Sequence, residues 1–91
     1  MVVKFLIPTP LRAYTANKDA VEVQGNTVDE ALKSLYTQYN ELKKHILGED
    51  GQLRSFVNIY VNEEDIRVLK KEATSLKNGD VLMIVPSIAG G

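Results

Sequence analysis

The sequence contains few side chains that could perform chemistry. It has no cysteine and a single histidine, His45. Without cysteine there is no disulfide, no thiolate ligand for a metal and no thiol nucleophile. The sequence also has no Gly-x-Ser-x-Gly motif, no cluster of metal ligands and no pair of histidines. We therefore expect no catalytic residue and no metal site, which argues against an enzyme.

The terminal carboxyl group of Gly91 is the remaining group with usable chemistry. Its pKa of about 3.3–3.7 makes it an anion at neutral pH and thus a poor electrophile. It can react only after activation, for example to an acyl adenylate made from ATP. The six glycines do not have the spacing of a phosphate-binding loop. We expect a partner adenylating enzyme to use the ATP, and this chain to bind no cofactor.

The last residues are suited to enter the active site of another protein. The segment from Pro86 to Gly91 can extend about 20 Å. Gly90 and Gly91 have no Cβ atom, so their backbone can pass through a narrow channel. We expect Gly91 to be the modified residue and Gly90, Ala89 and Ile88 to thread into the partner's active site, with Ile88 anchoring the base of the tail.

Composition limits the other possibilities. Ninety-one residues are enough for one domain and too few for a second core. Eleven basic and twelve acidic side chains give a net charge of -1, which argues against a nucleic-acid partner. The apolar run 81–85 is too short to span a membrane, and Pro8 interrupts the N-terminal apolar run before it could form a signal peptide. We therefore expect no membrane partner and a cytoplasmic location.

Four segments have the pattern of β-strands. Residues 2–7 and 20–24 form a predicted hairpin, because both are rich in β-branched residues and a polar stretch separates them. Residues 56–62 alternate between apolar and other side chains, so the strand has one apolar face. Residues 81–85 are continuously apolar, as in a strand buried in the middle of a sheet.

A helix is predicted between the hairpin and the later strands. Thr27 and Glu30 form a capping box at its start. Apolar residues then recur at helical spacing on one face: Val28, Ala31, Leu32, Leu35, Tyr39, Leu42 and Ile46. This pattern predicts one helix over 28–47, about 30 Å long, with Gly48 as a left-handed C-cap. A hairpin, one long helix and further strands indicate an α+β fold.

Four segments together resemble the ubiquitin-like sulfur carriers. They are Ile7–Arg12, Phe56–Arg67, Asn78–Asp80 and Pro86–Gly91. They are most similar to the carriers of cysteine biosynthesis, and less to the small subunit of molybdopterin synthase or to the thiamine carriers. The resemblance implies a β-grasp (ubiquitin-like) domain over residues 1–86, with one long helix packed across a mixed sheet. Residues 87–91 would then be a flexible C-terminal Gly-Gly tail.

The resemblance also implies a function and a set of partners. The chain would be a sulfur carrier, a protein co-substrate whose Gly91 is adenylated and converted to a thiocarboxylate. An adenylating and sulfur-transferring enzyme of the ubiquitin-activating type would perform these steps with ATP. The thiocarboxylate would donate sulfide to a pyridoxal-phosphate (PLP)-dependent, cysteine-synthase-like enzyme, and a metalloprotease would remove the cysteine adduct.

Two alternatives stay open at this point. The chain could be the small subunit of molybdopterin synthase, in which case its partner is the large subunit of that enzyme. It could also be a ubiquitin-like protein modifier whose Gly91 forms isopeptide bonds with lysines.

The outward face of the predicted strand 56–62 offers a place for partners to dock. Phe56 and Tyr60 point to this face, where either the segment 66–76 covers them or they form an exposed apolar patch. We favour the docking patch. The acidic residues 63–65 are more typical of a solvated turn than of a partner-pairing site, and His45 is typical of the last turn of a helix.

Overall fold

The computed structural model describes residues 1–51, 53–54 and 57–86. This part of the chain forms one five-stranded mixed sheet in the order β2-β1-β5-β3-β4. The strands are β1 (Val2–Leu6), β2 (Ala20–Gln24), β3 (Val57–Val61), β4 (Glu64–Asp65) and β5 (Val81–Pro86). β5 is parallel to β1, and every other strand pair is antiparallel. The predicted α+β, β-grasp architecture is therefore confirmed.

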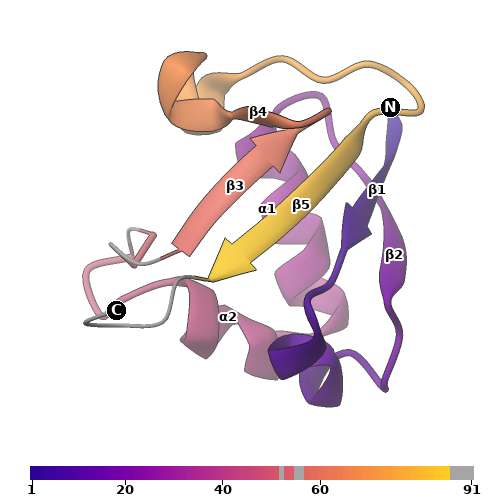
Figure 1. Cartoon of the computed structure of the whole chain (residues 1–91), viewed down its shortest axis with the longest axis vertical. Coiled ribbons are helices and arrows are strands. Elements are labelled where there is room, and N and C mark those ends of the chain that lie inside the picture. Colours follow the sequence, from indigo (N-terminus) through magenta and orange to yellow (C-terminus); the bar gives the residue numbers. More distant parts are fainter. Residues whose placement is uncertain (52, 55–56, 87–91) are drawn as a thin grey trace.

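The helices lie on one face of this sheet and leave the other face open (Figure 1). They are α1 (Val28–Gln38) and α2 (Asn40–Ile46). Three short 3-10 helices connect the other elements, namely η1 (Thr9–Tyr14), η2 (Ile66–Val68) and η3 (Lys71–Ala73). None of the helices in the described ranges is long and apolar enough to cross a membrane.

The core lies between the sheet and the two helices. Each strand contributes the residues of one face, because side chains alternate along an extended backbone. The helices contribute their apolar stripe. The buried residues include Val3, Phe5, Val21, Val23, Ala31, Leu32, Leu35, Leu42, Ile46, Val57, Ile59, Leu82 and Ile84.

The start of α1 has the predicted capping box. The Thr27 side chain accepts a hydrogen bond from the Glu30 backbone N–H at 3.2 Å, and the Glu30 carboxylate accepts one from the Asn26 N–H at 2.9 Å. Just before this cap, a Cβ atom on Gly25 would lie 2.5 Å from the backbone nitrogen of Ala31. Gly25 therefore lets the chain leave β2 in close contact with the helix.

The prediction of one long helix over 28–47 is wrong, because the helix breaks at Tyr39. The backbone there has φ -133° and ψ 78°, and α2 starts again at Asn40. The Thr37 hydroxyl donates to the Lys33 carbonyl, a contact that often bends helices. A straight helix would also run past the sheet, since five-residue strands span only about 17 Å. The break lets α2 turn and bury Leu42 and Ile46.

The predicted cap at Gly48 is also wrong. α2 ends at Ile46, and the next residue, Leu47, has an extended backbone with φ -101° and ψ 143°. Gly48 is not among the glycines with positive φ, which in the described ranges are Gly51 and Gly79. Gly79 has φ 88° in the turn before β5, so the predicted turn at 78–80 is confirmed.

The outer edge of β2 is covered by side chains of α1. The Ser34 hydroxyl donates to the Gln24 carbonyl at 2.7 Å, and the Gln38 amide donates to the Glu22 carbonyl at 3.5 Å. Both acceptors lie on the edge that β1 does not use. These bonds hinder the addition of another strand at this side of the sheet.

Replacing Thr27 with alanine should destabilise the protein by about 1 kcal/mol, because the Glu30 N–H loses its acceptor. Urea denaturation followed by circular dichroism measures this change. Thr37→Ala is the matched control on the same helix, and its effect should be within about 0.5 kcal/mol because Thr37 is exposed and only back-bonds to a helix carbonyl. Equal losses in the two variants would contradict the capping role.

Candidate functional site

β5 determines where the C-terminal segment leaves the domain. The strand lies between β1 and β3, and its last residue, Pro86, is paired with Val57. The predicted tail residues Ile88, Ala89, Gly90 and Gly91 lie outside the described residues, so their roles stay predictions. The structure describes the point at which that tail starts, which is the end of a strand that is paired with β1 on one side and β3 on the other.

One face of β5 is open, although the sequence pattern suggested a strand buried in the middle of the sheet. β5 is central, and Leu82 and Ile84 are fully buried under the helices. Met83 points to the opposite face and is 38% exposed. Val81 and Val85 on the same face are half-buried. One side of the apolar run 81–85 therefore packs in the core, and its other side forms part of the surface of the sheet.

An apolar row crosses the open face of the sheet. Leu6 of β1 is paired with Met83 of β5, and Met83 is paired with Tyr60 of β3. Because paired residues on one face are neighbours, these three side chains lie side by side. Leu6 and Tyr60 are half-buried. We call these three residues the sheet-face row.

The sheet-face row continues into a groove near the end of β5. The groove has a volume of about 420 Å³ and is lined by Leu6, Ile7, Pro8, Pro10, Arg12, Met83, Ile84 and Val85. The Arg12 Nε donates a hydrogen bond to the Ile7 carbonyl at 3.0 Å, which fixes this cation at the groove. The groove therefore offers apolar contacts and one positive charge beside the strand from which the tail leaves.

The predicted docking patch stays a prediction, and the structure describes one of its two residues. Tyr60 belongs to the sheet-face row, whereas Phe56 lies outside the described residues. Leu6 and Met83 were not predicted from the sequence as part of this surface. Leu6 shares a strand face with the exposed Lys4, which is a weak signal of outward orientation. The register of β1, β5 and β3 is needed to bring Leu6, Met83 and Tyr60 together.

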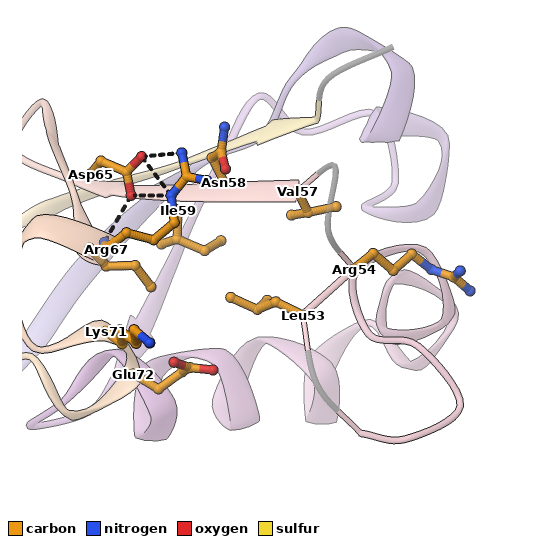
Figure 2. A pocket seen from close by; sticks show the side chains of 10 residues that line it. Leu53, Arg54, Val57, Asn58, Ile59, Asp65, Arg67, Lys71 and Glu72 are labelled. Carbon is orange, nitrogen blue, oxygen red and sulfur yellow. Dashed lines mark hydrogen bonds and ion pairs between the residues drawn. The ribbon is translucent and has the colours of Figure 1, made fainter. Parts of the chain in front are cut away.

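A second groove lies beside β3 and is drawn in Figure 2. Its volume is about 400 Å³, and its lining includes the apolar residues Leu53, Val57, Ile59 and Ile66. Charged side chains from the end of β4 and from the segment after it lie along this groove, namely Asp65, Arg67, Lys71 and Glu72 (Figure 2). In Figure 2 the Arg54 side chain points away from the groove. Its described lining contains no serine, threonine, cysteine or histidine side chain.

Asp65 and Arg67 form a two-pronged ion pair at this groove. The Arg67 guanidinium donates to both carboxylate oxygens, at 2.7 Å for the shorter Nη2–Oδ2 contact, and the Arg67 backbone N–H donates to Asp65 at 2.8 Å. These hydrogen bonds from Arg67 lower the pKa of the Asp65 carboxyl group. The same pair raises the pKa of Arg67. The pair therefore holds the segment after β4 in place.

The described residues contain no group of three or more histidine, cysteine, aspartate or glutamate side chains that could hold a metal ion. His45 stacks on Tyr14 with ring centroids 4.0 Å apart. This contact joins α2 to η1, so the histidine has a packing role.

Comparisons with known proteins agree with this arrangement. The sequence profile of the ThiS family matches residues 5–91. The chain is similar to the sulfur carrier protein CysO of Mycobacterium tuberculosis, with 37% identity over the full length of both chains. It is 35% identical over 65 residues to small archaeal modifier protein 3 of Haloferax volcanii, covering 71% of this chain and 70% of the relative.

The similarity extends to the three-dimensional structure. The structure of the Amycolatopsis orientalis BexX/CysO complex contains a chain that superposes with a TM-score of 0.88 and 37% identity. The match covers 98% of this chain and 99% of that one.

Replacing Arg67 with glutamine should raise the pKa of Asp65 towards the ordinary value of about 3.9, because the charged donors of the pair are lost. Carboxyl carbon shifts followed by NMR during an acid titration measure this pKa. Arg54→Gln is the control, because Arg54 donates to the Lys44 carbonyl and no hydrogen bond joins it to Asp65. An unchanged Asp65 midpoint in Arg67→Gln would contradict the ion pair.

Proposed function

The chain belongs to the ThiS family of ubiquitin-like sulfur carriers, and we propose that it carries sulfur as a thiocarboxylate on Gly91. The similarity to CysO along both whole chains is the observation that supports this most strongly. The end of β5 beside an apolar groove is consistent with a tail that is offered to other proteins.

The proposed chemistry takes place at the carboxyl group and not at a side chain. A carboxylate oxygen of Gly91 attacks the α-phosphate of ATP, and pyrophosphate leaves. The acyl adenylate is electrophilic, so a sulfide nucleophile adds to its carbonyl carbon and AMP leaves with the electrons of the broken C–O bond. Gly91 then ends in a thiocarboxylate, which can donate its sulfur to an acceptor. ATP and both active sites belong to partner enzymes.

The acceptor that we propose is a PLP-dependent, cysteine-synthase-like enzyme. The full-length identity to CysO favours this pathway over molybdopterin synthesis. A metalloprotease would then release the cysteine adduct from Gly91. Under this proposal the chain is a co-substrate and not an enzyme.

The open sheet face is the proposed docking surface for the adenylating enzyme. The sheet-face row presents apolar side chains that the domain leaves uncovered, and it leads directly to the groove at the end of β5. An enzyme that covers the row and the groove would therefore also hold the start of the tail. The relative CysO occurs in a complex with BexX, which agrees with a carrier that forms protein complexes.

Protein modification is a second candidate function. The 35% identity to small archaeal modifier protein 3 favours it, because that relative is named for modifying other proteins. Both functions begin with the same adenylate at Gly91. They differ in the nucleophile, which is sulfide for the carrier and a lysine amine for the modifier.

Incubation of the purified chain with its adenylating enzyme, ATP and sulfide should convert Gly91 to the thiocarboxylate. Intact-mass spectrometry would detect the replacement of one oxygen by one sulfur at the C-terminus. Deletion of Gly91 should abolish the change without altering thermal stability. If wild-type protein instead forms conjugates with lysines and never gains sulfur, the carrier function is wrong and the modifier function is supported.

Met83→Asp should raise the KM of adenylation by about tenfold or more, because it places a charge in the centre of the sheet-face row. Steady-state pyrophosphate release at varied carrier concentration measures this effect. The control Asn40→Asp adds the same charge at an exposed position at the start of α2, on the opposite side of the sheet, and should leave KM unchanged. An unaltered KM in a folded Met83→Asp protein would show that the enzyme docks elsewhere.

A further inference from the structure

The groove at the end of β5 exists because β1 stops earlier than β5. β1 ends at Leu6, whereas β5 continues past the residue paired with Leu6 as far as Pro86. Pro8 has no N–H, so it cannot continue the hydrogen bonds of the parallel pair. The Ile7 N–H points to the other side, where it donates to the Asp19 carbonyl at 2.8 Å. The last residues of β5 are therefore paired with β3 on one side and border an open groove on the other.

The wall of this groove that follows β1 is mainly apolar. Leu6, Ile7, Pro8 and Pro10 contribute their side chains to it. The two prolines have no N–H to donate, and the N–H and the carbonyl of Ile7 are both used, by Asp19 and Arg12 respectively. The wall therefore favours an apolar side chain as its occupant over a further strand, which would need free backbone groups.

Arg12 is the one charged residue among the described residues that line the groove. Its Nε donates to the Ile7 carbonyl, and its guanidinium forms no ion pair with another described residue. A guanidinium has five N–H donors, so the Nη groups of Arg12 can still bind a carboxylate.

The other charges on the neighbouring strands balance one another. Lys4 of β1 is paired with Glu22 of β2, and Lys18 directly precedes Asp19 in the turn before β2. None of these four residues lines the groove. The charge of Arg12 is therefore left without a nearby acidic partner in the described part of the chain.

The five residues after Pro86 have the chemistry that complements this groove. They are Ser-Ile-Ala-Gly-Gly and lie outside the described residues. Ile88 is their one large apolar side chain, and none of the five side chains is charged. The carboxylate of Gly91 is then the only charge of the segment. One apolar side chain and one anion thus match an apolar lining and one cation.

The segment also starts at the right place to reach the groove. Val85 lines the groove, and only Pro86 separates it from the segment. Five extended residues span about 17 Å, and Gly90 and Gly91 allow the backbone to turn because they have no Cβ atom. A tether this short gives the segment an effective concentration on the order of millimolar at the groove. The chain's own C-terminal segment therefore has an advantage over any ligand in solution.

We propose that the groove is the resting site of this C-terminal segment, with Ile88 against the apolar lining and the Gly91 carboxylate on the Arg12 guanidinium. The inference rests on the proposed function in one respect, because it takes Gly91 as the residue with the free carboxyl group. A thiocarboxylate is also an anion, so the same site holds the terminus after it has gained sulfur. An adenylating enzyme that docks on the sheet-face row then meets the terminus at the edge of its docking surface.

NMR on the isolated full-length chain tests this inference without any enzyme. The pKa of the Gly91 carboxyl group, followed through its carbonyl carbon shift, should lie about half a pH unit or more below the ordinary 3.3–3.7, because Arg12 stabilises the anion. Arg12→Gln should return this pKa to the ordinary range. The matched control Lys77→Gln removes the same charge at an exposed position in the turn before β5 and should leave the pKa low.

A second variant changes the segment and not the groove. In the wild type, nuclear Overhauser effects should join the Ile88 methyl groups to Pro8 and Met83. Ile88→Ser should remove the apolar contact and raise the Gly91 pKa, while the thermal stability of the domain stays the same because position 88 follows β5. This variant separates a loss of the resting site from a loss of the fold.

Two results would overturn the inference. One is an equal Gly91 pKa in the wild type and in Arg12→Gln. The other is a set of Overhauser effects between differently labelled copies, which would make a second copy the occupant of the groove. Either result leaves the proposed function standing, because the gain of sulfur is measured separately by mass. A chain that holds its terminus in the groove and never gains sulfur would contradict the proposed function alone.

Discussion

β5 is paired on both sides, parallel to β1 and antiparallel to β3. Its partners are the N-terminal strand and a strand of the second half of the chain, so the sheet is complete only when the first and last strands have met. The helices form the crossover that a parallel pair requires. Leu82 and Ile84 then lie in the centre of the core. The strand that completes the sheet is therefore also the strand after which the tail begins. The pairs of β5 with β1 and β3 thus fix the point at which the tail starts.

The two edges of the sheet are protected in different ways. On β2, Ser34 and Gln38 of α1 donate hydrogen bonds to the outer carbonyls. At the other edge, β4 has only two residues, so it offers little backbone to another strand. The ion pair of Asp65 and Arg67 places charged side chains at the end of this strand. Partners are thus expected to recognise side chains on the open face, and not to extend the sheet.

Tyr36 has the one buried side-chain polar atom without a hydrogen-bond partner in the described part of the chain. Burial raises the pKa of its hydroxyl group, and the nearby Asp29 and Glu72 act in the same direction. The phenol therefore stays neutral, and it can remain buried without a counter-charge. Its ring packs with the core, so the side chain contributes apolar area at the cost of one unsatisfied hydroxyl.

The sequence by itself determined the features that depend on neighbouring residues. The capping box at Thr27 and Glu30, the turn around Gly79 and the alternating strand over 56–62 were predicted, because each needs only local geometry; the structure has that strand over Val57–Val61. The lack of cysteine and of a phosphate-binding loop likewise favours the Gly91 carboxyl group as the reactive group, although residues 87–91 lie outside the described structure and that role stays a prediction.

Only the tertiary structure decided the features that depend on distant contacts. The break at Tyr39 arises because the helix must follow the outline of a short sheet, which no local pattern encodes. The sheet-face row exists because three strands pair in one register, and those strands are far apart in sequence. An apolar residue such as Met83 has the same local pattern whether the face above it is covered or open, so its exposure follows from where the helices pack.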